Sequence, residues 1–168
     1  NSYSGRVSSN FGNENFRNFV QLNHSESDGY RYNTDYKVNN VYYQNQYKIS
    51  NGNVKFQAGF QEKKFGANGF YASPTYTEQY EEIQMAIVSA GLEKKFSENL
   101  GFNTNVYWKR AQDMYLLKRN NPSFYRNMHI GNHVGVDVSA HYKSFLGITG
   151  IGTDVRKEFL ESNRLGSR

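Results

Sequence analysis

The segment from His133 to Lys143, HVGVDVSAHYK, alternates strictly between apolar and polar side chains. In an extended chain successive side chains point to opposite faces, so the two kinds of residue separate. The apolar face holds Val134, Val136, Val138, Ala140 and Tyr142, and the polar face holds His133, Gly135, Asp137, Ser139, His141 and Lys143. The segment predicts a β-strand that lies between an apolar and a wet environment.

The same period of two recurs along the chain and predicts an all-β protein of about seven or eight antiparallel strands. It is clear in Val54 to Gln61 and in Leu100 to Trp108, and weaker in Val41 to Ile49, where Asn45 interrupts it. Other segments have the composition of strands, but their faces do not separate clearly. These are Phe16 to His24, Ile83 to Leu92 and, more weakly, Ile148 to Phe159.

Short turns alternate with long polar connections between these strands. The short turns lie at Asn10 to Glu14, Ser50 to Asn53, Ser97 to Asn99 and Ser144 to Gly147. The long connections are Ser25 to Asp35, Lys63 to Gln79 and Asp113 to Asn132. Alternation of short turns with long loops is typical of transmembrane β-barrels, whose loops are long on the outer side only.

The composition fits the same interpretation. Only 37% of the 168 residues are hydrophobic, although 16% are aromatic and none is cysteine. A barrel with a wet interior and aromatic girdles at the membrane interfaces accounts for both values. No apolar run is long enough for a membrane helix. The net charge of +5 is spread along the chain, so no basic tract indicates nucleic acid.

Three segments carry a resemblance to a known family. They are SESDGYRYNTDYKVNNVYYQ (Ser25 to Gln44), AGFQEKKFGANGFYASPTYTEQYEE (Ala58 to Glu82) and VYWKRAQDMYLLKRNNP (Val106 to Pro122). Together they resemble the barrel of TonB-dependent outer-membrane receptors, and most closely the cobalamin and colicin-receptor branch. The resemblance covers nearly the whole chain.

This resemblance implies a 22-stranded barrel in the bacterial outer membrane, plugged by an N-terminal domain. Such a receptor imports a scarce ligand, such as cobalamin or an iron chelate, with energy relayed by TonB. Residues 1 to 168 would then be a partial barrel domain, roughly a third of the wall. Its partners would be outer-membrane lipid, the plug and remaining strands, TonB through the absent N-terminal region, and a small ligand.

Two alternatives stay open from the sequence. One is a complete eight-stranded barrel, for which this length is ordinary. The start in mid-strand at Asn1 to Val7 and the lack of a terminal aromatic residue favour an internal piece of a receptor instead. The other alternative is a soluble β-sandwich that binds glycans or a protein through exposed rings.

The loop aromatics Tyr30, Tyr32, Phe70, Tyr71 and Tyr76 are the predicted ligand-binding residues. Rings on external loops can stack on a ligand while their hydroxyls form hydrogen bonds. His133, Asp137 and His141 are predicted to line the lumen. Positions four apart on a strand are roughly 13 Å apart, which is too far to share one metal ion.

No cofactor is assigned, although Asp28 and Asp35 bracket a loop where oxygen ligands could hold calcium. Motifs for catalysis are lacking. The chain contains neither a G-x-S-x-G nor an H-E-x-x-H sequence, and its GITGIG stretch is not followed by the Lys-Ser or Lys-Thr of a phosphate loop. The sequence therefore predicts a protein that is not an enzyme.

Overall fold

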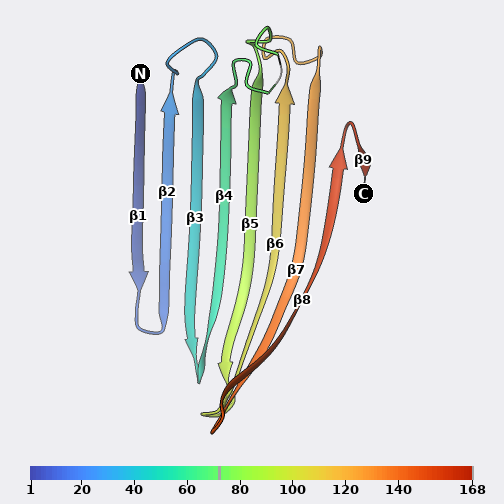
Figure 1. The fold of residues 1–168 in the computed structure, drawn as a ribbon. Coiled ribbons are helices and arrows are strands. Elements are labelled where there is room, and N and C mark those ends of the chain that lie inside the picture. The colour runs from blue at the N-terminus through green and yellow to red at the C-terminus, as the bar shows by residue number, and fades with distance from the viewer. Residues whose placement is uncertain (72, 168) are drawn as a thin grey trace.

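A computed structural model describes residues 1–71 and 73–167 and shows one nine-stranded antiparallel sheet (Figure 1). The strands follow one another in chain order, each paired with the next. They are β1 (Ser2–Gly12), β2 (Phe16–Ser27), β3 (Tyr36–Ile49), β4 (Gly52–Gly66), β5 (Tyr80–Lys95), β6 (Leu100–Leu116), β7 (Arg126–Ser144), β8 (Gly147–Ser162) and the short β9 (Gly166–Ser167).

The all-β, antiparallel prediction is confirmed, and eight long strands agree with the expected number. The sheet is not closed into a barrel, because within the described residues β1 pairs only with β2, and β8 only with β7 and β9. A complete eight-stranded barrel is therefore wrong for this structure. So is a sandwich, which needs two packed sheets.

The register of the ladder brings the apolar faces of the strands together. Val136 lies opposite Val106 on β6, and Val106 lies opposite Ala90 on β5. We call the side that carries Val136 the apolar face and the side that carries Asp137 the polar face. The same register settles the two strands whose faces the sequence left open. On β2 and β5 the apolar face holds Val20, Leu22, Ala86, Val88, Ala90 and Leu92.

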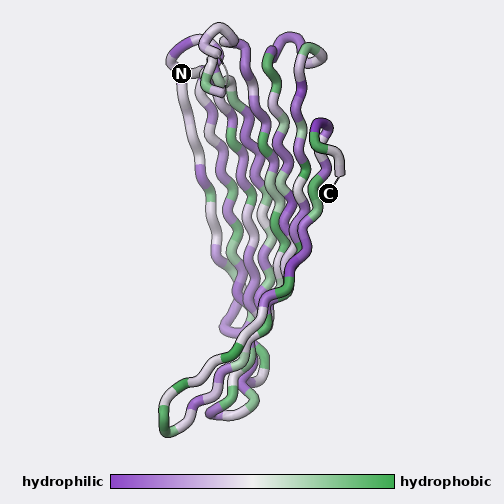
Figure 2. Tube along the Cα trace, turned by 45° about the vertical axis from the view of Figure 1, so that its right-hand side comes forward, coloured by the Kyte–Doolittle hydropathy of each residue, from purple (hydrophilic) through white to green (hydrophobic). Residues whose placement is uncertain are grey.

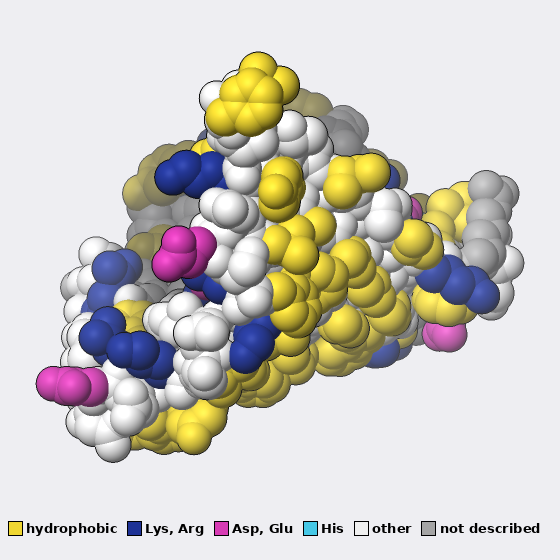
Figure 3. Space-filling model, turned by 90° about the horizontal axis from the view of Figure 1, so that it is seen from below, with side chains coloured by type: hydrophobic (Ala, Val, Ile, Leu, Met, Phe, Trp, Pro, Cys, Tyr) yellow, Lys and Arg dark blue, Asp and Glu magenta, His cyan; other side chains and the backbone are white. Residues whose placement is uncertain are grey.

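This sheet has almost no dry core. Among the described residues the only buried apolar side chains are Ala67 and Leu116, whereas Val106 is 48% exposed and Val7 69% exposed. Green and purple alternate along the strands in Figure 2, and Figure 3 shows hydrophobic side chains gathered in one patch with charged groups at its sides. The described residues contain no helix that is long and apolar enough to cross a membrane.

Strands extend farther toward the long connections than the sequence predicts. The loops shrink to residues 28–35, 67–79 and 117–125, and they gather at one end of the sheet in Figure 1. Residues predicted to be loop, such as Lys63 and His129, lie in the ladder opposite Ile83 and Asp113. At the end of β4, Glu62, Lys63 and Lys64 make both faces polar, so no period-two signal distinguishes this stretch from loop.

Gly52 begins β4 at a point where the strands leave no room for a side chain. A Cβ there would lie 2.1 Å from the backbone oxygen of Glu93, whereas a Cβ at Gly5 would meet nothing within 4 Å. We expect Gly52→Ala to destabilise the full-length protein by about 1–3 kcal/mol, because backbone must move. Thermal unfolding followed by circular dichroism checks this. Gly5→Ala is the control, and equal midpoints for the two variants would contradict the close approach.

Candidate functional site

Three loops join into one cap at the end of the sheet. Asn33 donates hydrogen bonds of 2.7 Å from its amide to the backbone oxygens of both Thr77 and Gln79. Arg119, from the third loop, donates to a carboxylate oxygen of Asp35 at 2.7 Å and from its backbone N–H to the Glu78 carbonyl at 2.8 Å. Loops that follow β2, β4 and β6 are therefore held together, although they are far apart in sequence.

Gln79 organises the second loop from the inside. Its side chain is fully buried, with 0% exposed. The side-chain oxygen accepts a 3.0 Å hydrogen bond from the Tyr71 N–H, and the side-chain nitrogen donates at 2.9 Å to the Tyr76 carbonyl. The backbone oxygen of Gln79 accepts from the Ala67 N–H at 2.8 Å. These contacts place the Tyr71 ring over the end of the sheet.

Below the cap lies a hollow of about 440 Å³ on the polar face. It is lined by Tyr71 from the loop and by Glu81, Asp113, Tyr115, Leu117, Tyr125 and Asn127 from β5, β6, β7 and the residues that adjoin them. The ladder explains this grouping. Glu81 lies opposite Tyr115, and Tyr115 lies opposite Asn127, so all three point to the same side.

Aromatic rings form the walls of this hollow. The Tyr71 and Tyr115 centroids are 5.7 Å apart with an interplanar angle of 83°, and those of Tyr115 and Tyr125 are 6.3 Å apart at 73°. Phe70 packs edge-on against Tyr71 at 5.0 Å. Such edge-to-face geometry is favoured by the ring quadrupoles.

Two carboxyl groups share the hollow with these rings. Burial raises the pKa of Glu81, and the charge of Asp113 raises it further, against opposing contributions from Tyr71 and Lys63. Burial also raises the pKa of Asp113, while His129 acts in the opposite direction. For the Tyr71 hydroxyl, burial is again the first cause of a raised pKa, and a hydrogen bond to Glu81 adds to it.

The five predicted ligand-binding residues do not stay together. Tyr32 and Tyr76 belong to the joined loops, where the Tyr32 hydroxyl donates to Glu78. Phe70 is 81% exposed, and Tyr30 is 85% exposed with the Arg31 guanidinium 5.4 Å from its ring centroid. Tyr71 alone among the five lines the hollow.

Sequence reasoning missed the other residues of the hollow. Asp113, Tyr115 and Tyr125 fall in the segment predicted as a long loop, and Glu81 is adjacent in sequence to a second glutamate, Glu82. That pair does split between faces as the period of two requires, with Glu81 on the polar face and Glu82 on the apolar face. Asp113, Tyr115 and Leu117 occupy every second position, so a strand through this segment would have placed them on one face.

His133, Asp137 and His141 all lie on the polar face, in separate rows of the ladder. His133 lies 3.3 Å from a carboxylate oxygen of Glu158, and Asp137 accepts a 3.4 Å hydrogen bond from Asn105. In the described residues no three His, Asp or Glu side chains are grouped to hold a metal ion. Of the two loop aspartates considered for calcium, Asp35 is bonded to Arg119.

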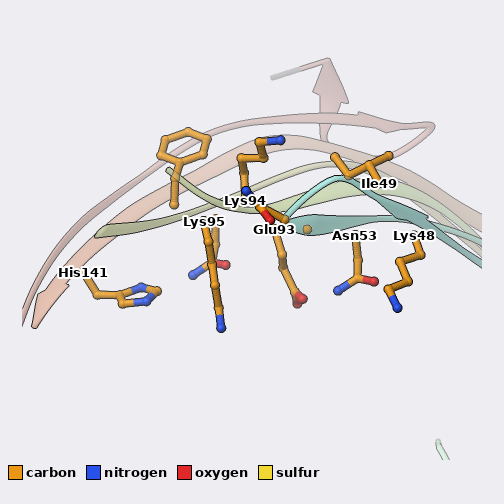
Figure 4. Close-up of a pocket in the computed structure, with 11 residues that line it drawn as sticks. Lys48, Ile49, Asn53, Glu93, Lys94, Lys95 and His141 are labelled. Atoms are coloured by element: carbon orange, nitrogen blue, oxygen red, sulfur yellow. The ribbon is translucent and has the colours of Figure 1, made fainter. Parts of the chain in front are cut away.

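A second hollow, of about 570 Å³, lies at the short-turn end. In Figure 4 the strands arch over Lys48, Asn53, Glu93, Lys95 and His141, whose side chains all point to the inner side of the curve. Glu93 pairs with Lys55, and the other basic groups keep this end of the polar face wet. The polar face is thus the inner side of the curved sheet here.

Comparison with models of protein families and with curated proteins gives no match.

Removal of the Gln79 side-chain amide should loosen the loop of residues 67–79. We expect Gln79→Ala to leave the Tyr71 N–H and the Tyr76 carbonyl unpaired, at a cost of about 1–3 kcal/mol. Limited proteolysis of the folded protein should then cut loop 67–79 on the order of tenfold faster. Thr75→Ala, an exposed position in the same loop, is the control. Unchanged cleavage in Gln79→Ala would show that Gln79 does not hold the loop.

The raised pKa of Glu81 predicts a pH effect. An acid whose folded pKa lies above its unfolded pKa favours folding below about pH 4, and this contribution is lost as the pH rises through the folded pKa. Glu81→Gln stays neutral, so its unfolding midpoint should rise relative to the parent between about pH 4 and pH 7. Glu82→Gln, on the opposite face, should show no such rise. Parallel pH profiles for the parent and Glu81→Gln would contradict the burial effect.

Proposed function

We propose that this chain is part of the barrel wall of a TonB-dependent receptor in the bacterial outer membrane. One observation carries the proposal, namely that a single-layer sheet exposes an apolar face on one side and a polar face on the other. In water the apolar face would lack a cover, whereas lipid covers it in a membrane. The polar face then lines a wet lumen, with His133, Asp137 and His141 on its wall.

The height of the apolar face supports a bilayer as its environment. On β7 the apolar residues run from Val134 to Tyr142. This apolar band is nine residues long, within the roughly 9 to 11 residues that a tilted strand needs to cross a bilayer. Rings gather at the short-turn border of this band. Phe16 packs on Tyr47 at 6.2 Å and Phe96 on Phe102 at 6.2 Å, as in an aromatic girdle.

The stagger of the short turns supports a barrel wall. Val7 and Asn132 lie in one row of the ladder. Val7 is five residues from the end of β1 at Gly12 (12 − 7), and Asn132 is twelve from the end of β7 at Ser144 (144 − 132). The distance from this row to the short turn therefore increases by about 1.2 residues, or roughly 4 Å, from each strand to the next. Because neighbouring strands are about 4.8 Å apart, short turns that lie in one plane require a strand tilt of roughly 40°. Membrane barrels have tilts of about this size.

Beyond the apolar band, toward the loops, the same face becomes charged. The Lys64 ammonium lies 2.9 Å from a carboxylate oxygen of Glu62 and 3.7 Å from one of Glu82. Ion pairs of this kind belong in water or among lipid headgroups and not in hydrocarbon. The strands therefore project past the membrane on the loop side, which we assign as the outside.

The open edges of the sheet indicate further strands. Unpaired N–H and C=O groups along β1 and β8 are not tolerated in lipid, so the wall must continue on both sides. The proposed receptor also comprises the remaining strands and a plug, and it works with TonB. Its ligand is small and scarce, such as cobalamin or an iron chelate. The receptor binds this ligand on the outer side and imports it when the plug rearranges. No covalent chemistry and no nucleic acid are involved.

Adjacent residues of β7 should report two different environments. We expect a nitroxide at Val136→Cys to be relaxed mainly by oxygen, which dissolves in lipid. A nitroxide at Asp137→Cys should be relaxed mainly by a water-soluble nickel complex in the lumen. Power-saturation spectroscopy of the full-length protein in bilayers measures both, and the chain itself contains no cysteine to compete.

If β7 is part of a barrel wall, lipid-facing and lumen-facing positions must continue to alternate along it. Val138→Cys should behave like the Val136 label, and Ser139→Cys like the Asp137 label, since they lie on the same faces. Equal access of the nickel complex to all four positions would show that the apolar face does not meet lipid, and would overturn the proposal.

A further inference from the structure

We propose that the hollow between Tyr71, Tyr115 and Tyr125 binds an organic cation that carries N–H donors, such as an alkylammonium group. This inference rests on the proposed function, because it takes the loop end of the polar face as the outer mouth of the lumen. It names the chemical class of the ligand that this mouth recognises. The hollow differs from the exposed loop rings predicted from the sequence, since only Tyr71 belongs to both.

The polar groups of the hollow are mainly hydrogen-bond acceptors. Glu81 and Asp113 contribute carboxylates, and neither forms an ion pair with a base in the described part of the chain. The side-chain oxygen of Asn127 is buried and has no hydrogen-bond partner. Such an orphaned acceptor needs a donor, which water or a ligand must supply. A ligand rich in N–H groups can donate to the two carboxylates.

The walls favour a cation over a neutral donor. Three tyrosine rings line the hollow and meet nearly edge to face, and the face of each ring carries partial negative charge. Cations are attracted to such faces, and aromatic cages bind alkylammonium groups in this way. The Arg164 guanidinium already lies 4.7 Å from the Tyr125 centroid, so Tyr71 and Tyr115 are the rings left for the ligand cation.

Other ligand charges fit the hollow less well. An anion would meet two carboxylates at close range, which costs affinity. A neutral aromatic ligand would stack on the rings but would leave the Asn127 oxygen and the carboxylates without compensation. Lys63 and His129 influence Glu81 and Asp113 from the neighbouring positions of the polar face, but they are not among the residues that line the hollow.

Benzylamine and benzyl alcohol form a matched pair of probes, since they have nearly the same shape and differ in an ammonium versus a hydroxyl group. Calorimetric titration of the purified full-length protein, at neutral pH and constant salt, measures both. We expect the Kd of benzylamine to be at least about tenfold lower than that of benzyl alcohol. Equal affinities, or no saturable binding of benzylamine, would overturn the proposal.

Substitutions locate the binding. Glu81→Gln and Asp113→Asn should each weaken benzylamine by about three- to thirtyfold and leave benzyl alcohol unchanged. Glu82→Gln, one residue away on the opposite face, is the control and should bind benzylamine like the parent. If Glu82→Gln weakens binding as much as Glu81→Gln, the cation does not sit in this hollow. Spin-label accessibility on β7 tests the barrel separately, so failure of one proposal is distinguishable from failure of the other.

Discussion

The ladder of backbone hydrogen bonds between neighbouring strands is the interaction on which this structure depends. A globular domain is held mainly by apolar side chains packed between layers, but here there is one layer and almost nothing is packed inside it. Strand pairing therefore holds the architecture together. In a medium without water this is sufficient, because an unpaired backbone group has no alternative partner there.

Because the sheet has almost no core, each of its two faces needs its own environment. The side chains on the two faces cannot exchange places, because a slip of one residue would move every valine of β7 to the wet side. Rings on the polar face also lie close to the sheet. The Tyr107 ring occupies the space above Gly135, and the His141 ring the space above Gly101, where an added Cβ would come within 2.4 Å and 2.2 Å of ring atoms. Such glycines let large rings lie flat on the polar face.

Much of the sheet could be predicted because period two is a direct consequence of extended backbone. HVGVDVSAHYK revealed its faces, and the short turns showed where strands reverse. The outer end of β4 could not be predicted, since Lys63 lies between Glu62 and Lys64 on a stretch that is polar on both faces. The hollow was harder still. It depends on contacts between residues distant in sequence, such as Tyr71 with Tyr115, and no local pattern records those contacts.

The strict succession of the strands has a consequence for how the protein is made. Within the described residues each strand pairs only with the one before it and the one after it, so the sheet can grow hairpin by hairpin without closing a large loop of chain at any step. The cap is different. Asn33, Gln79 and Arg119 meet only after β2 to β7 stand side by side. A partly assembled intermediate that lacks one of the strands joined by these loops therefore has an incomplete cap.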